Sequence, residues 1–125
     1  MSSAPLRVYS YSRCSTCRKA LQWLAQQGFL ADNGRLEVLD ITLTPPSLNE
    51  LRQAFAAVGR RRLFNTSGQS YRALGSAVIA AMDDDQALAA LAADGRLIKR
   101  PLLLAPDGTV LVGFQLEEWS AHLQP

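Results

Sequence analysis

A β-type run, a loop and two cysteines lie near the start of the chain, in the stretch Leu6-Arg7-Val8-Tyr9-Ser10-Tyr11-Ser12-Arg13-Cys14-Ser15-Thr16-Cys17. Apolar side chains then recur with the spacing of one buried helix face, at Cys17, Ala20, Leu21 and Leu24. Gly28 stands where a glycine commonly ends a helix. The stretch therefore predicts a strand over residues 6–9 and a helix over residues 15–27.

Strand and helix patterns alternate along the rest of the chain. We expect a strand over 36–41, helices over 48–58, 71–74, 78–82 and 83–94, a hairpin of strands over 102–104 and 109–112, and a helix over 116–123. The strand–helix–strand start requires a parallel crossover, and the hairpin adds two strands to the same sheet. We therefore predict an α/β fold, a four-stranded mixed sheet with helices on both faces, in a single domain over residues 1–125. The helices between about 45 and 97 are expected to be an insertion into that domain.

Composition and charge argue against several classes of protein. The chain has 125 residues, 48% of them hydrophobic, which is enough apolar surface for one core. A net charge of +2 is too small to indicate nucleic-acid binding by itself. The sequence shows no signal-peptide pattern and no run of about 18 apolar residues that would span a membrane. We therefore expect a cytoplasmic protein that contacts neither a membrane nor nucleic acid directly.

The spacing of the two cysteines points to redox chemistry. Cys14 directly precedes the expected helix, where free backbone N–H groups and the helix dipole stabilise a thiolate over a thiol. Arg13 and Arg18 add positive charge nearby. Cys17 follows three residues later, which brings the two sulfurs within bonding range on the first helical turn. We therefore expect Cys14 to be the nucleophile and Cys17 to resolve a mixed disulfide formed on it.

Other interpretations of the cysteines and of one basic run remain open. A closed zinc site needs about four ligands, and the chain offers two cysteines and one distant histidine, His122, so we expect no metal site. Cys17 also lies on the apolar helix face, so a pair of inert core cysteines is a competing interpretation. Three consecutive arginines at 60–62 are interpreted as a solvated cluster at a helix exit.

A second candidate site segment, Ile98-Lys99-Arg100-Pro101, precedes the third strand. A proline is tolerated at the first residue of a strand because it needs no N–H there. Arg100 is suited to hold an oxyanion through two hydrogen bonds or to stabilise a thiolate, with an ordinary surface charge as the alternative. We therefore take Arg100 as a candidate catalytic residue. Pro101 is taken as a candidate substrate-binding residue only through the family resemblance described next.

Four segments of the sequence together resemble the arsenate reductase (ArsC)/Spx family. They are Tyr9-Ser10-Tyr11-Ser12-Arg13-Cys14-Ser15-Thr16-Cys17-Arg18-Lys19-Ala20, Phe64-Asn65-Thr66-Ser67-Gly68-Gln69-Ser70-Tyr71-Arg72, Leu97-Ile98-Lys99-Arg100-Pro101-Leu102 and Val112-Gly113-Phe114. The resemblance implies a thioredoxin-like (glutaredoxin-like) fold with a helical insertion. It also implies a cis-proline at Pro101 that faces the active cysteine, whereas an ordinary trans proline is the alternative from sequence alone.

The resemblance to arsenate reductases is partial at the site itself. Those enzymes use one cysteine, which matches Cys14, together with three arginines around the oxyanion and a histidine before the cysteine. Arg100 matches one arginine, but the other two positions fall near Asn65 and Gly113, and the histidine position falls near Ser10. Substitutes for the missing arginines are sought at Arg72 or among residues 60–62, and Arg13 and Arg72 are taken as candidate substrate-binding residues.

Three functions follow from the residues and the resemblance. The first is a thiol–disulfide oxidoreductase, with arsenate as one candidate substrate. It would hold no resident cofactor and would use glutathione with a glutaredoxin, or a thioredoxin-type protein, as reductant. The alternative is a redox-sensing transcriptional regulator of the Spx type that binds RNA polymerase, because Cys17 resembles the second cysteine of that branch. The third is a thioredoxin-like domain whose cysteines are dormant.

Overall fold

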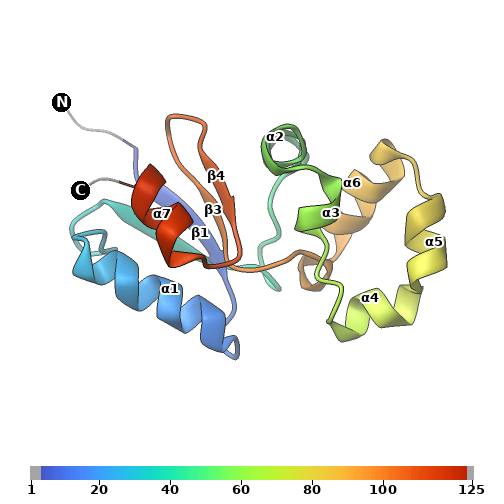
Figure 1. Cartoon of the computed structure of the whole chain (residues 1–125), viewed down its shortest axis with the longest axis horizontal. Helices are drawn as coiled ribbons and strands as arrows, with labels where there is room; N and C mark the ends of the chain where they lie inside the picture. The colour runs from blue at the N-terminus through green and yellow to red at the C-terminus, as the bar shows by residue number, and fades with distance from the viewer. Residues whose placement is uncertain (1–3, 124–125) are drawn as a thin grey trace.

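Four strands form one mixed sheet in the computed structural model, which describes residues 4–123 (Figure 1). The strands are β1 (Leu6–Ser10), β2 (Leu36–Asp40), β3 (Leu102–Leu104) and β4 (Val110–Val112), in the order β2-β1-β3-β4. β1 and β2 are parallel, whereas the β1–β3 and β3–β4 pairs are antiparallel. The predicted mixed sheet, with a parallel start and a hairpin at the end, is confirmed.

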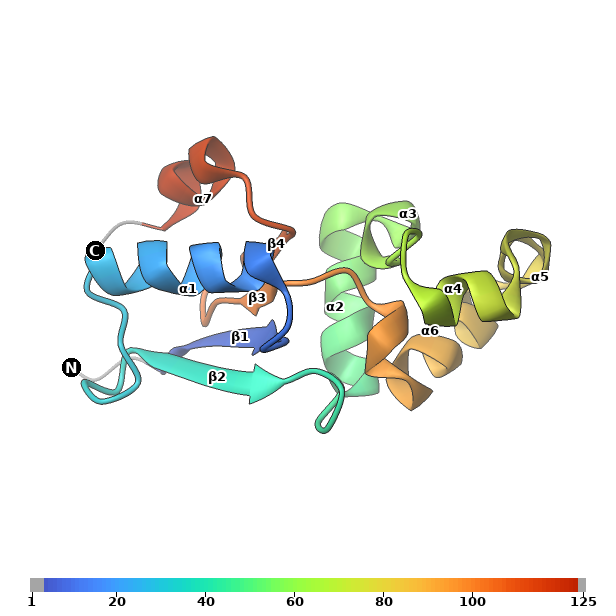
Figure 2. The same ribbon diagram turned by 90° about the horizontal axis from the view of Figure 1, so that it is seen from below.

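The helices fall into two groups that lie in different places (Figure 2). α1 (Ser15–Gln26) and α7 (Leu116–His122) cover one face of the sheet. The others lie between β2 and β3 in sequence, at the end toward which β1 and β2 point. They are α2 (Leu48–Val58), α3 (Arg60–Leu63), α4 (Gln69–Leu74), α5 (Ser76–Ala81), α6 (Asp84–Ala93) and the 3-10 turn η1 (Gly95–Leu97). The short helices expected near 71–74 and 78–82 are thus α4 and α5.

Alternation along the strands divides the core into two parts. Successive strand side chains point to opposite faces of a sheet. Val8, Leu103 and Leu111 face α1 and α7 and pack with Trp119, which is fully buried. Tyr9 and the neighbours of Leu103 face the other way and pack with apolar residues of α2 and α6. The sheet is therefore covered on both faces, as predicted.

A short antiparallel bridge ties the helical segment to the start of β3. Phe64 pairs with Ile98 outside the main sheet. The N–H of Asn65 donates to the carbonyl of Leu97 at 2.8 Å, and the N–H of Lys99 donates to the carbonyl of Leu63 at 2.7 Å. The loop after α3 is therefore held beside the residues that lead into Pro101.

The interpretation of Arg60 as a solvated arginine is wrong. Its guanidinium donates to the carbonyls of Ile79 and Met82, at 2.6 and 2.8 Å, and pairs with Asp84 at 3.3 Å. The last carbonyls of a helix have no partner within the helix, and those at the end of α5 bind this side chain. Arg60 therefore fastens α3 to the end of α5, and Arg61 is left exposed on the surface.

We expect Gly95→Ala to destabilise the chain because Gly95 is buried directly against the backbone of Ile41. A methyl group added there would collide with the Ile41 carbonyl, so the backbone would have to move. Overpacking of this kind costs about 1–3 kcal/mol, measurable as a lower free energy of unfolding in a urea titration. Gly68→Ala is the matched control because its methyl would meet chiefly the movable side chain of Asn65. An equal or larger loss at Gly68 would contradict this account.

Candidate functional site

Cys14 caps the first helix with its sulfur. It precedes α1 in an extended conformation, and the N–H of Cys17 donates to its Sγ at 3.2 Å. This position is usually taken by Ser, Thr, Asp or Asn, whose oxygen accepts the same hydrogen bond. The loop before it is held by the N–H of Cys14 on the carbonyl of Tyr11 and by Arg18 on the carbonyl of Ser12. The sulfur therefore sits at the positive end of the helix, where it accepts a backbone hydrogen bond.

Cys17 is a free thiol of a different kind. It is fully buried, whereas Cys14 is half-buried. Burial raises the pKa of the Cys17 thiol to about 11, and the neighbouring Cys14 acts in the same direction. Hydrogen bonds from the Tyr11 backbone and the Ser10 side chain lower that pKa by less. Cys17 is therefore protonated at neutral pH, so it must lose a proton before it can attack a disulfide.

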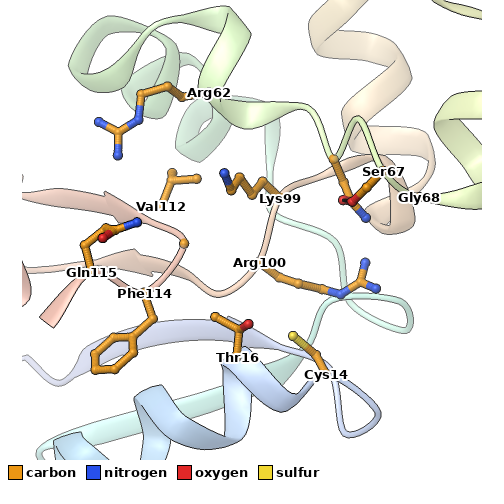
Figure 3. Close-up of a pocket in the computed structure, with 12 residues that line it drawn as sticks. Cys14, Thr16, Arg62, Ser67, Gly68, Lys99, Arg100, Val112, Phe114 and Gln115 are labelled. Carbon is orange, nitrogen blue, oxygen red and sulfur yellow. Dashed lines mark hydrogen bonds between the residues drawn. The ribbon is translucent and has the colours of Figure 1, made fainter.

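A cavity of about 650 Å³ opens beside Cys14 (Figure 3). Its walls come from four segments of the chain: the start of α1, α3 with the loop to α4, the residues before β3, and the end of β4 with the loop to α7. The lining residues are Cys14, Thr16, Arg62, Asn65, Ser67, Gly68, Lys99, Arg100, Val112, Gly113, Phe114 and Gln115. The bridge between Phe64 and Ile98 brings the second and third of these segments together.

Three cations line this cavity, namely Arg100, Lys99 and Arg62, and no carboxylate from residues 4–123 does. The guanidinium of Arg100 lies 4.9 Å from the centre of the Tyr11 ring, which orients it by a cation–π contact. Arg100 also borders a smaller neighbouring cavity of about 240 Å³, together with Arg96. The third cation, Arg62, approaches Glu118 of α7 at 3.6 Å. The cavity is therefore suited to an anionic ligand.

The structure brings together some of the residues predicted from sequence and separates others. Cys14 and Arg100 both line the cavity, and Cys17 lies buried beneath Cys14. Pro101 is buried next to Arg100, and the bond between them is cis, as the resemblance implies. Arg13 and Arg72 are exposed and line neither this cavity nor its neighbour. Their proposed contact with substrate stays a prediction without support from the geometry.

The main residue that the sequence did not reveal is Lys99, whereas Arg62 is one of the three arginines at 60–62 among which a substitute for a missing arginine was sought. Lys99 was visible as the neighbour of Arg100, but nothing in the pattern showed that both side chains reach the same cavity. Arg62 was grouped with its neighbours in the arginine run, because the chain's turn at Gly59 cannot be seen in the sequence. Asn65 and Gly113, where the resemblance places arginines, do line the cavity. Arg62 and Lys99 thus supply cations in a cavity where those two arginines are missing.

The structure adds two observations about ligands and membranes. Within the range 4–123, no group of three or more His, Cys, Asp or Glu side chains is placed to hold a metal ion. No helix in the same part of the chain is both long enough and apolar enough to cross a membrane.

A mixed sheet, a helix capped by a cysteine and a second cysteine one turn later define a thioredoxin-like α/β protein with a dithiol site. The model of the ArsC family matches residues 9–122. The chain belongs to this family of thiol oxidoreductases.

Individual relatives match over nearly their whole length. The chain is 39% identical over 121 residues to the uncharacterized protein YusI of Bacillus subtilis, covering 94% of this chain and 97% of that protein. It is 33% identical over 121 residues to an arsenate reductase of Neisseria meningitidis, with the same coverage of 94% and 97%. The structure of a possible arsenate reductase from Streptococcus mutans superposes with a TM-score of 0.80 at 36% identity, covering 94% of this chain and 99% of that one. The predicted thioredoxin-like fold is confirmed.

We expect the stability of the protein to depend on pH through Cys17. Its thiol has a pKa of about 11 in the folded chain against an ordinary value of 9.0, so the folded state holds the proton more tightly. The stabilisation is complete below pH 9 and is lost as pH rises toward 11. The free energy of unfolding of the wild type should therefore fall more steeply over this range than that of Cys17→Ser.

Tyr9 serves as the internal control for this measurement. Burial raises its pKa to about 12, but Tyr9 is present in both proteins, so its contribution cancels in the comparison. If the free energy of unfolding falls equally with pH in the wild type and in Cys17→Ser, burial does not raise the pKa of the Cys17 thiol.

Proposed function

We propose that the chain is a thiol–disulfide oxidoreductase in which Cys14 is the nucleophile and Cys17 is the resolving thiol. The observation that carries this proposal is the position of the Cys14 sulfur, which caps α1 and borders a cationic cavity. The buried thiol of Cys17, one turn along the same helix, supports the second role. An inert pair of core cysteines would not need one sulfur in a cavity wall.

The first step is attack of the Cys14 thiolate on one sulfur of a substrate disulfide. A bond forms between Cys14 Sγ and that sulfur while the substrate S–S bond breaks. The departing sulfur leaves as a thiolate and takes up a proton from water. The hydrogen bond from Cys17 N–H and the end of the α1 dipole stabilise the attacking sulfur before this step.

The second step is attack of Cys17 on the Cys14 sulfur. Cys17 gives up its thiol proton, bonds to Cys14 Sγ and releases the second half of the substrate as a thiol. The protein is now oxidised by two electrons and the substrate is reduced by two. Because burial raises the pKa of Cys17 to about 11, this step is expected to speed up as pH rises above neutral.

A thiol reductant then has to restore the two cysteines. We propose glutathione with a glutaredoxin, or a thioredoxin-type protein, in this role. Two thiols of the reductant give up two electrons and two protons, and the protein disulfide becomes two thiols again. Cys14 is the half-buried member of the pair, so it is the sulfur that a reductant reaches.

Arsenate is a second kind of substrate that we propose, because relatives of this chain are named arsenate reductases. Cys14 would form a sulfur–arsenic bond and displace one arsenate hydroxyl, which takes up the thiol proton and leaves as water. A second thiol, from Cys17 or glutathione, would attack Cys14 Sγ, so that the electron pair of the sulfur–arsenic bond stays on arsenic and arsenite departs. Arg100 would hold the oxyanion through charge-assisted hydrogen bonds.

A redox-sensing role of the Spx type, with RNA polymerase as the partner, is the second candidate function. It is favoured by the same pair of cysteines, whose oxidation would bind α1 to its own cap. Capture of RNA polymerase by the oxidised but not the reduced protein would support it, and equal capture by both, or by neither, would exclude it.

We expect the two cysteines to give different trapped species with a neutral disulfide such as bis(2-hydroxyethyl) disulfide. Intact-mass measurement should find a Cys14–Cys17 disulfide in the wild type. Cys17→Ser should accumulate a mixed disulfide on Cys14, and Cys14→Ser should form neither product. Each substitution serves as the matched control for the other, since both replace one thiol with a hydroxyl. A mixed disulfide on Cys17 in Cys14→Ser at a similar rate would reverse the assigned roles.

With arsenate, glutathione and a glutaredoxin, we expect coupled turnover by the wild type that Cys14→Ser abolishes. Arg100→Ala should lower kcat/KM for arsenate by roughly ten- to a hundredfold, because it removes a hydrogen bond between charged groups worth about 1.5–3 kcal/mol. No turnover of arsenate by a wild type that still exchanges disulfides would exclude arsenate and leave the dithiol chemistry standing.

A further inference from the structure

The cavity beside Cys14 is much larger than a compact oxyanion. Its volume of about 650 Å³ is typical of a site for a small organic ligand. One water molecule takes up only about 30 Å³ of liquid. A substrate that fills this cavity therefore extends well beyond the atom that reacts with Cys14.

The three cations of the cavity are directed to two different places (Figure 3). Arg100 points toward the side that holds Cys14 and Ser67. Lys99, its neighbour in sequence, points the other way, toward Val112 and Arg62. One positive charge thus lies near the reacting sulfur, and two lie at the remote end of the cavity.

The side chain of Lys99 lies across Gly113. A Cβ on Gly113 would come within 3.3 Å of Lys99 Cε and 4.0 Å of its Nζ. Gly113 also has a φ of 68°, a conformation that glycine adopts readily. Within the described part of the chain, no carboxylate pairs with the Lys99 amine. The absence of a side chain at 113 therefore leaves room for a free ammonium group in the cavity.

The second remote cation, Arg62, is held loosely. Its Nη2 lies 3.6 Å from Glu118 Oε1, which is longer than a hydrogen bond. The same Glu118 oxygen is buried and has no hydrogen-bond partner among the residues described. Arg62 can therefore exchange this contact for a better one with a ligand carboxylate.

We propose that Lys99 and Arg62 form a recognition site for a carboxylate on the substrate, remote from its reacting sulfur. This inference rests on the proposed dithiol function and names its substrate class: thiols and disulfides of peptide size that carry a carboxylate. The sulfur of such a molecule meets Cys14 while its carboxylate meets the remote cations. Glu118 competes with that carboxylate for Arg62.

The test compares two disulfides that differ in charge. They are oxidised glutathione and the same molecule with its glycine carboxylates converted to amides. Each is mixed with reduced Cys17→Ser protein, and formation of the Cys14 mixed disulfide is followed by mass. We expect Lys99→Met to lower the ratio of the two rates, anionic over amide, by roughly tenfold, the low end for a hydrogen bond to a charged group.

Two further variants separate recognition from general electrostatics. Lys19→Met removes one positive charge from an exposed site on α1 outside the cavity, and it should leave both rates unchanged. Glu118→Gln should raise the ratio by about two- to threefold, as expected for loss of one partly exposed ion pair. Lys99→Arg should keep most of the ratio because it keeps the charge.

The outcomes distinguish failure of this inference from failure of the proposed function. An unchanged ratio in Lys99→Met, or an equal fall in Lys19→Met, overturns the recognition site while the dithiol chemistry stands. A fall in the ratio for Glu118→Gln also contradicts it. If Cys14 reacts with neither disulfide in the parent protein, the proposed function itself fails.

Discussion

The N–H of Cys17 points at the sulfur of Cys14, 3.2 Å away, and the rest of the site is arranged around that contact. It fixes the first turn of α1, because a helix start needs acceptors for its free N–H groups. The loop before Cys14 is held by hydrogen bonds to the carbonyls of Tyr11 and Ser12, so the sulfur is also fixed where it lines the cavity. The same bond thus serves helix stability and thiol chemistry. An oxygen-bearing residue at 14 would serve only the first.

Two of the other walls of the cavity are held together by a bridge of two residues. Phe64 and Ile98 pair outside the main sheet and carry Asn65, Lys99 and Arg100 into place. The buried contact of Gly95 with Ile41 holds the same segment against the end of β2. The helical segment between β2 and β3 is therefore more than an addition to the sheet. It supplies one wall of the cavity and the loosely held Arg62.

Much of the fold was predictable because it depends on local patterns. The period of the apolar residues gave the strands and long helices, and the position of Cys14 before α1 gave the nucleophile. The environment of the arginines was not predictable. Arg60 is bound to the end of α5 and Arg62 borders the cavity beside Cys14, whereas Arg61 lies on the surface and does not border that cavity. Only the tertiary structure distinguishes them, as it does for exposed Arg13 and Arg72.

The cations of the cavity are of two chemical kinds, arginine and lysine, and the difference matters for what they bind. An arginine grips a compact oxyanion with two parallel hydrogen bonds, whereas a lysine is a flexible point charge. Arg100 keeps the first type of group close to Cys14, while Lys99 places the second type across Gly113. Under the recognition we propose, a cavity with this arrangement suits a longer molecule whose negative charge lies at a distance from its reacting sulfur. Glycine at 113 leaves the space that the Lys99 side chain occupies, and the Cys14 sulfur caps α1 independently of that position.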